Sequence, residues 1–143
     1  MTPQERAERS AAAMWASDDA SKWVGMSLQR VTPGGAVLAL RVEKHHTNGH
    51  DICHGGVIFT LADSAFAFAC NSYNQVAVAQ HNMISFTEPG HLGDDLTATA
   101  REVSLRGKSG LYDVRVARGD GTVIAEMRGC SRIIAGQHFE EET

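Results

Sequence analysis

The sequence predicts an α+β fold in which one long antiparallel sheet wraps around a central apolar helix, with a further helix at the N-terminus. Three observations predict this fold. The segment from Gly55 to Cys70 is apolar on every side of a helix, apart from Asp63. Alternating apolar and polar residues mark strands before and after that segment. Turns that contain glycine or proline separate the strands, as is typical of antiparallel neighbours.

The elements follow one another along 143 residues. A helix is expected over residues 4–16, and a polar connector over 18–22. Two strands, 26–32 and 36–42, flank the turn Pro33-Gly34-Gly35. A polar loop, 43–53, leads into the central helix. Four strands follow, over 76–87, 96–105, 111–118 and 122–134, and 135–143 form a tail. We expect a single domain, 1–143, with its core over about 23–134.

The composition argues against several classes of function. The formal net charge is −4, which does not favour binding to nucleic acid or to an anionic membrane surface. The N-terminus lacks the apolar stretch of a signal peptide, and no apolar run reaches the ~20 residues of a membrane span. The three cysteines, Cys53, Cys70 and Cys130, lack a disulfide-like spacing, so we expect a cytoplasmic protein.

Asp63 is the most informative residue of the chain. A carboxylate in the middle of an apolar helix costs free energy, or its pKa rises. A salt bridge or a hydrogen bond from a backbone N–H group would be a structural reason for it. Chemistry on a bound substrate would be a functional reason. Because ion-pair networks also perturb carboxylates, the residue alone leaves both explanations open.

The residues before the helix favour the functional explanation. Gly55 and Gly56 open the helix, so its first N–H groups can face a ligand without an intervening Cβ atom. These groups have no partner within the helix and carry the positive end of its dipole. They are suited to an oxyanion or a polarised carbonyl. A plain tight turn into the helix is the alternative.

Other side chains that could carry chemistry give weaker patterns. The segment before the central helix contains five residues of metal-binding types, His45, His46, His50, Cys53 and His54. They lack paired ligand spacing, so no metal is expected. Cys53 and His54 are adjacent, and adjacent residues seldom face each other as nucleophile and base. Arg106 and Lys108 lie in a glycine-containing turn, where they would either bind phosphates or be solvated charges.

Together these motifs resemble the hotdog-fold acyl-CoA thioesterases of the phenylacetate-degradation (PaaI) family. The resemblance rests on His54-Gly55-Gly56, on Leu61-Ala62-Asp63-Ser64-Ala65 and on Asn48. It extends to residues 80–86 and 106–110, and it covers about 15–134. It implies hydrolysis of an acyl-CoA to the free acid and CoA, without a cofactor other than the CoA of the substrate. The acyl group that it implies is phenylacetyl or hydroxyphenylacetyl.

The resemblance also implies roles for individual residues. The N–H of Gly55 would polarise the thioester carbonyl, Asp63 would be the catalytic carboxylate, and Asn48 would assist. Whether Asp63 is a general base or a nucleophile stays open, with the general base preferred. Ser64 either holds the water or bonds a helix carbonyl, and His54 orients the loop. The residues expected to bind CoA are Arg106, Lys108, Ser109, His81 and Asn82.

The spacing between Gly55 and Asp63 predicts a dimer. Eight residues along one helix correspond to roughly 12 Å, so one thioester carbon cannot lie about 3 Å from both. A two-fold dimer with antiparallel helices would bring Gly55 of one chain to Asp63 of the other, and would cover the open sides of both helices. We expect a homodimer with shared active sites, assembled further into a tetramer.

Two other functions are compatible with this fold. A hotdog dehydratase or hydratase would have a catalytic histidine near the helix and a proline-rich approach to it, whereas residues 48–56 contain no proline. A non-catalytic acyl-CoA-binding module could dispense with Asp63. Release of free thiol from an acyl-CoA distinguishes hydrolysis from both.

Overall fold

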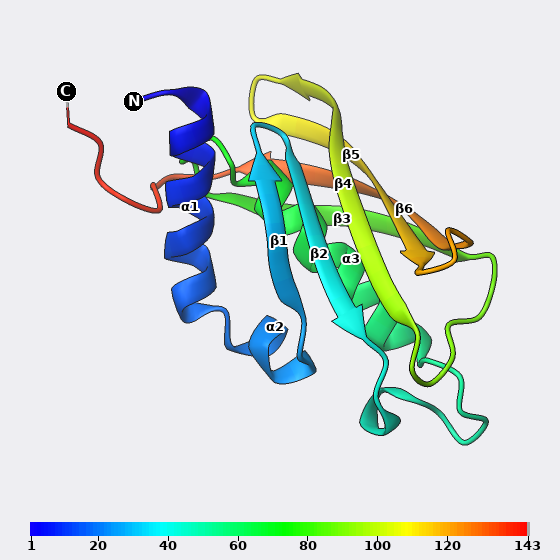
Figure 1. The fold of residues 1–143 in the computed structure, drawn as a ribbon. Helices are drawn as coiled ribbons and strands as arrows, with labels where there is room; N and C mark the ends of the chain where they lie inside the picture. The colour runs from blue at the N-terminus through cyan, green and yellow to red at the C-terminus, as the bar shows by residue number, and fades with distance from the viewer. Residues whose placement is uncertain (143) are drawn as a thin grey trace.

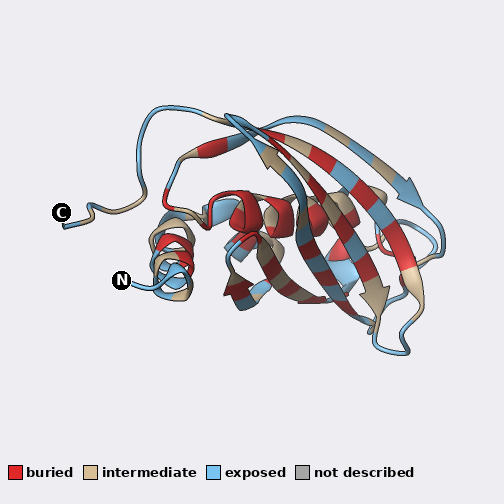
Figure 2. Ribbon diagram, turned by 90° about the horizontal axis from the view of Figure 1, so that it is seen from above, coloured by how far each residue is buried: buried red, intermediate tan, exposed pale blue. Residues whose placement is uncertain are grey.

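The computed structural model describes residues 1–142, in which a six-stranded antiparallel sheet curves around one central helix (Figure 1). The strand order is β1-β2-β4-β5-β6-β3. Helix α3, Gly55–Cys70, contacts all six strands, and the sheet arches over it when the molecule is seen from above (Figure 2). This arrangement confirms the predicted α+β fold.

The strands lie close to their predicted positions. Every strand end is within two residues of the expected one. The bounds are β1 Ser27–Thr32, β2 Gly35–Arg41, β3 Ala77–Phe86, β4 Asp95–Arg106, β5 Ser109–Arg118 and β6 Val123–Ile133. The N-terminal helix, α1, spans Pro3–Ser17, and the loop before α3 contains a short 3₁₀ turn, Lys44–His46. Within residues 1–142 no helix is long and apolar enough to cross a membrane.

The polar connector predicted over 18–22 is wrong, because a second helix, α2, spans Asp19–Val24. The Asp18 side chain caps this helix by accepting the N–H of Ser21 at 3.0 Å. Gly25 ends it in the left-handed conformation, with φ at 96°. A helix of 6 residues is too short to show a helical period in the sequence.

The alternation along the strands sorts their side chains onto two faces of the sheet. On β4, Leu96, Ala98 and Ala100 are buried toward α3, whereas Thr97 and Thr99 are exposed on the outer face. Figure 2 shows the same banding of buried and exposed residues across the sheet. The hydrophobic core therefore lies between the inner face of the sheet and α3.

Strand β3 is an edge strand and is unusually exposed. Among residues 1–142 it pairs only with β6. Val78, Met83 and Phe86 are 43%, 64% and 52% exposed. Asn82 lies opposite buried Gly129 in the register with β6, so it faces α3. This edge presents apolar surface as well as unpaired backbone groups.

The C-terminal segment packs back onto the helices. Asn74 Nδ2 donates to the carbonyl of Phe139 at 3.0 Å and to Glu141 at 2.9 Å. Arg6 of α1 pairs with Glu141 at 2.9 Å, and the Arg9 guanidinium lies 4.2 Å from the centre of the Phe139 ring. The predicted tail therefore contacts α1 and the segment after α3; position 143 lies outside the described residues.

Candidate active site

The first N–H groups of helix α3 point away from the rest of the helix. His54 is the N-cap, and its Nδ1 accepts the N–H of Gly56 at 2.8 Å. Within residues 1–142 the N–H of Gly55 has no hydrogen-bond acceptor. A Cβ atom at position 55 would lie 3.3 Å from the Phe86 ring, so glycine permits the close approach of β3. The Gly55 N–H is thus a free donor at the positive end of the helix.

A cavity of about 410 Å³ lies at this end of α3. Gly55 and Ile58 line it from the helix, Asn48 from the preceding loop, and Phe86 from the end of β3. Asn48 Oδ1 accepts the N–H of His50 at 2.9 Å. In the described part of the chain its Nδ2 has no acceptor, so this group can donate to a ligand beside Gly55.

Asp63 lies farther along α3 and is half-buried. Its Oδ1 accepts Nδ2–H of Asn82 at 2.7 Å. Burial raises the pKa of this carboxyl above its ordinary value of 3.8, and the hydrogen bond from Asn82 opposes that rise. Neither a cation nor a backbone N–H group of residues 1–142 pairs with it. The structural reasons considered for this carboxylate are therefore absent from its described surroundings.

Asp63 lines a second cavity, of about 300 Å³. Its walls are mainly apolar, with two polar side chains besides the acid, Asn71 and His138. The apolar residues are Met14, Phe66, Ala67, Cys70, Val76, Ala77, Val78 and Ala79. Burial raises the pKa of the Cys70 thiol to about 12, so this thiol is protonated and unreactive at neutral pH. An apolar cavity with one carboxylate is a typical small-molecule site.

The two cavities are separate within one chain. They share no lining residue, and one contains Gly55 while the other contains Asp63. Strand β3 runs past both, with Phe86 in the first cavity and Ala77 in the second. The Gly55 N–H and the Asp63 carboxylate, which are predicted to act on one carbonyl, thus lie in different cavities of the same chain.

Ser64 contacts helix α2. Its Oγ lies 2.8 Å from the Oγ of Ser21, and that hydroxyl donates to Asp18 Oδ2 at 2.7 Å. This contact corresponds to neither predicted role, the bond to water or the bond to a helix carbonyl. It joins α2 to α3, and we therefore leave Ser64 out of the proposed chemistry.

The turn between β4 and β5 gathers positive charge. Arg106 and Lys108 are exposed there, and Ser109 accepts from Arg132 Nη1 at 3.4 Å. Arg132 is a cation that the sequence analysis missed. Only the pairing of Ser109 with Arg132 between β5 and β6 brings it to this turn, and no local motif shows that pairing.

His81 and Asn82 lie on opposite faces of β3. His81 is exposed and lies opposite Cys130 in the register with β6, on the outer face of the sheet. Asn82 points inward and donates to Asp63. Asn82 thus lies beside the acid and on the opposite face of β3 from His81, and its part in binding CoA stays a prediction.

The residues of metal-binding types between His45 and His54 do not converge. Within residues 1–142 no three His, Cys, Asp or Glu side chains are placed to hold a metal ion together. His46 is buried, accepts the N–H of Glu43 at 2.9 Å and bonds the carbonyl of Val24. This histidine therefore ties the loop to the end of α2.

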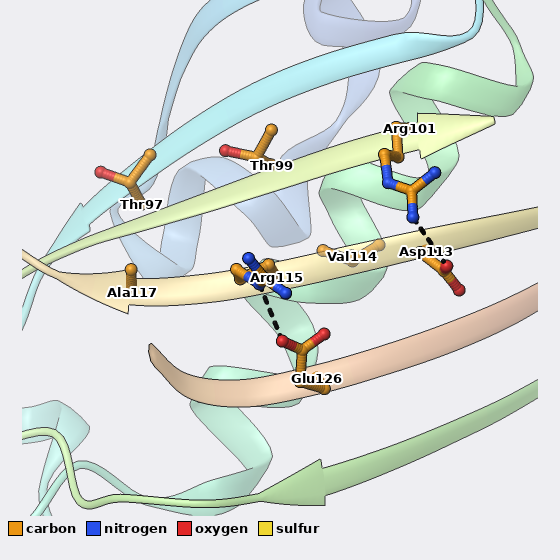
Figure 3. Close-up of a pocket in the computed structure, with 8 residues that line it drawn as sticks. All are labelled: Thr97, Thr99, Arg101, Asp113, Val114, Arg115, Ala117 and Glu126. Atoms are coloured by element: carbon orange, nitrogen blue, oxygen red, sulfur yellow. Dashed lines mark hydrogen bonds and ion pairs between the residues drawn. The ribbon is translucent and has the colours of Figure 1, made fainter. Parts of the chain in front are cut away.

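The outer face of the sheet carries a polar hollow (Figure 3). Its charges pair with one another: Arg101 with Asp113 at 3.3 Å, and Arg115 with Glu126 at 2.8 Å. Arg128 also binds Asp113, at 2.7 Å, and this hydrogen bond lowers the pKa of that carboxyl. These groups lie on the face of the sheet opposite α3, and we assign them no part in the chemistry.

The six-stranded sheet wrapped around one apolar helix defines a hotdog-type fold, and comparisons with known proteins identify its class. The sequence profile of the thioesterase superfamily matches residues 50–125. Acyl-coenzyme A thioesterase PaaI of Escherichia coli is 42% identical over 132 residues, which are 92% of this chain and 94% of that protein. The chain therefore belongs to the thioesterase superfamily, and it is a thioester hydrolase.

Solved structures agree with this membership. The E. coli PaaI protein from the phenylacetic acid degradation operon superposes with a TM-score of 0.93 at 38% identity, covering 95% of this chain and 99% of that one. A mutant form of the phenylacetic acid degradation protein PaaI of Thermus thermophilus gives a TM-score of 0.79 at 32% identity, covering 82% and 100%. The comparisons therefore support a hydrolase rather than a dehydratase or a non-catalytic binding module.

Proposed function

We propose that this protein is an acyl-CoA thioesterase that cleaves phenylacetyl-CoA, or a ring-hydroxylated form of it, to the free acid and CoA. The observation that carries the proposal is a single carboxylate, Asp63, without a counter-ion among residues 1–142, on an apolar cavity of about 300 Å³. Cavities of about 150 Å³ accept benzene, so this one has room for an aryl ring and its methylene. The small side chains of Ala77 and Ala79 in its wall favour such a ring.

The chemistry follows from the free donors and acceptors of the site. The thioester oxygen accepts the N–H of Gly55, which stabilises negative charge as it develops there, and Asn48 Nδ2 adds a second donor. Asp63 takes a proton from a water molecule that attacks the carbonyl carbon. The carbon–sulfur bond then breaks, and the departing CoA thiolate takes up the proton. The bond from Asn82 occupies Asp63 Oδ1 and leaves Oδ2 for the water.

The site requires a second subunit. Gly55 and Asp63 lie in separate cavities of one chain, roughly 12 Å apart along α3. Antiparallel pairing of two β3 edges would cover Val78, Met83 and Phe86 and set the two α3 helices antiparallel. Gly55 of one subunit would then lie beside Asp63 of its partner. The proposal includes a homotetramer built from two such dimers.

The nucleotide of CoA has a candidate site at the β4–β5 turn. Arg106, Lys108 and Arg132 supply positive charge for its phosphates, with Ser109 among them. His81 lies along the outer face of β3, where the pantetheine chain of CoA would leave the site. No cofactor other than the substrate's CoA is needed for this reaction, and we place the enzyme in the cytoplasm.

Release of free thiol tests this function. The purified protein is given phenylacetyl-CoA, hydroxyphenylacetyl-CoA, acetyl-CoA and hexanoyl-CoA, and a thiol reagent reports CoA. We expect the highest kcat/KM for the two aryl substrates. Equal or better turnover of the straight-chain substrates would refute the aryl assignment, and no thiol from any of them would refute the activity.

A further inference from the structure

Asn82 is a polar side chain directed into the apolar space between β3 and α3. It lies opposite Gly129 on β6. A Cβ atom on Gly129 would come within 2.9 Å of both Asn82 Oδ1 and the ring of Phe66. Glycine at position 129 therefore leaves the room in which the carboxamide sits. The arrangement of β6 and α3 accommodates this side chain closely.

Only one end of this carboxamide is hydrogen-bonded. Nδ2 donates to Asp63 Oδ1 at 2.7 Å, a length typical of a charge-assisted bond. Asn82 Oδ1 is buried and accepts no hydrogen bond from residues 1–142. A buried acceptor without a donor destabilises the fold, and an apolar side chain of similar size would avoid that cost. Packing therefore does not explain an asparagine at this position, whereas the bond to Asp63 does.

We propose that Asn82 is a positioning residue that holds Asp63 Oδ1, so that the other carboxylate oxygen faces the attacking water. The inference rests on the proposed function of Asp63, and it goes beyond the roles assigned above. A donor on a carboxylate also stabilises its charged form, which a general base requires. Asn82 thus acts on both the orientation and the ionisation of the acid.

No other described group performs this task for Asp63. The titratable side chains that share its cavity are Cys70 and His138. The Cys70 thiol is uncharged at neutral pH, as noted above. His138 Nε2 bonds Asn71 Oδ1 at 2.8 Å, and burial lowers the pKa of its imidazole, so it too is neutral. On the α2 side, Asp18 is engaged by Ser21.

The direction of the pH effect follows from these surroundings. Burial raises the pKa of Asp63, and within residues 1–142 the bond from Asn82 is the contact that opposes this rise. Without that bond the pKa of Asp63 rises further. Because the ionised carboxylate is the active form, a variant without the donor loses activity at a higher pH than the wild type. The acid limb of kcat/KM should therefore move upward.

The test compares Asn82→Leu and Asn82→Ala with the wild type on phenylacetyl-CoA across pH. Leucine keeps the branched shape of the side chain and removes the donor, and alanine removes both. Ser85→Ala, at an exposed position of the same strand, is the matched control. We expect the acid limb to rise by about one pH unit in both Asn82 variants. At the plateau, kcat should fall about tenfold with KM changed less than about twofold.

Asp63→Asn, measured in parallel, separates this inference from the proposed function. If it is inactive while folded Asn82 variants keep the wild-type profile, the positioning role is wrong and the function stands. A limb that moves to lower pH, or a raised KM at constant kcat, would also overturn the role; the second result would return Asn82 to CoA binding. If Asp63→Asn keeps full activity, the proposed function fails and this inference with it.

Discussion

At the scale of single residues, the catalytic role that we propose for Asp63 comes at the expense of stability. It is half-buried and, among residues 1–142, lacks a counter-ion. Asp63→Asn keeps the shape of the side chain and removes its charge. We expect thioester hydrolysis to fall by about 10²–10⁴-fold, the range of general-base contributions. Initial rates of thiol release measure this, with circular dichroism to confirm the fold, and near-normal rates would contradict the assignment.

The same substitution should stabilise the protein, in a pH-dependent manner. The pKa of Asp63 is raised in the folded state. At pH values between the unfolded and the folded pKa, the folded protein therefore keeps a proton that the unfolded chain has lost. The carboxyl therefore destabilises the fold increasingly as pH rises from 3.8 through its folded pKa, and fully above it. Asp63→Asn should raise Tm at pH 7, and the gain should vanish below pH 3.8. A variant less stable than the wild type at pH 7 would speak against this explanation.

The sequence could identify the candidate residues but not all of their partners. Asp63 and Gly55 stand out because an acid in an apolar helix and paired glycines at its start are local patterns. The contact between Asn82 and Asp63 depends on how β3 packs against α3, and the distance of 2.7 Å has no local signature. The bond between Ser64 and Ser21 could not be predicted either, because helix α2, which carries Ser21, was not predicted.

At the scale of elements, Gly129 on β6 sets the space for both Phe66 and Asn82. Gly129→Ala would place a Cβ atom 2.9 Å from each, so one of them must shift. We expect a loss of about 1–3 kcal/mol of stability, as for other overpacked cores, together with reduced turnover. Denaturant unfolding measures the first effect and thiol release the second.

Gly119→Ala is the matched control for that substitution. A Cβ atom there would meet nothing closer than 3.9 Å, so stability should stay within about 0.5 kcal/mol of the wild type. If Gly129→Ala is as stable and active as this control, the close packing between β6 and α3 does not constrain the site.

The β4–β5 turn should govern affinity for CoA. Changing Arg106 and Lys108 together to alanine should raise KM for acyl-CoA more than it lowers kcat, because phosphate contacts bind the ground state and the transition state alike. The effect should shrink at high salt. A short thioester without the nucleotide should be unaffected. Arg30→Ala, an exposed cation on β1, is the control. An unchanged KM for acyl-CoA would remove this turn from the CoA site.

The positions of the strands along the chain could be predicted, but their order in the sheet could not. Alternation and turn residues placed every strand end within two residues. The order β1-β2-β4-β5-β6-β3 makes β3 an edge strand, although it lies in the middle of the sequence. Strand order depends on contacts between residues that are distant in the sequence. For the same reason, the position of Arg132 beside the β4–β5 turn could not be predicted.

At the scale of the whole molecule, the separation of Gly55 from Asp63 is the central feature. The helical spacing predicted it from the sequence, and the two groups line different cavities. The size and the apolar walls of the Asp63 cavity could not be predicted from the sequence, since they depend on how α1, α3 and β3 pack together. The dimer that we propose, which joins the Gly55 cavity of one subunit to the Asp63 cavity of the other, would account both for this separation and for the exposed apolar side chains of β3.

Complementation between two inactive variants tests this account most directly. Asp63→Asn and Gly55→Val, on differently tagged chains, are co-expressed, and the protein that carries both tags is isolated. Cross-linking between the β3 edges of differently tagged chains confirms that it contains heterodimers rather than two homodimers. One of its sites carries both defects and the other carries neither. We predict that thiol release from phenylacetyl-CoA returns to about half the wild-type rate per dimer, while each homodimer stays inactive. A heterodimer as inactive as its parents would contradict an active site shared between subunits.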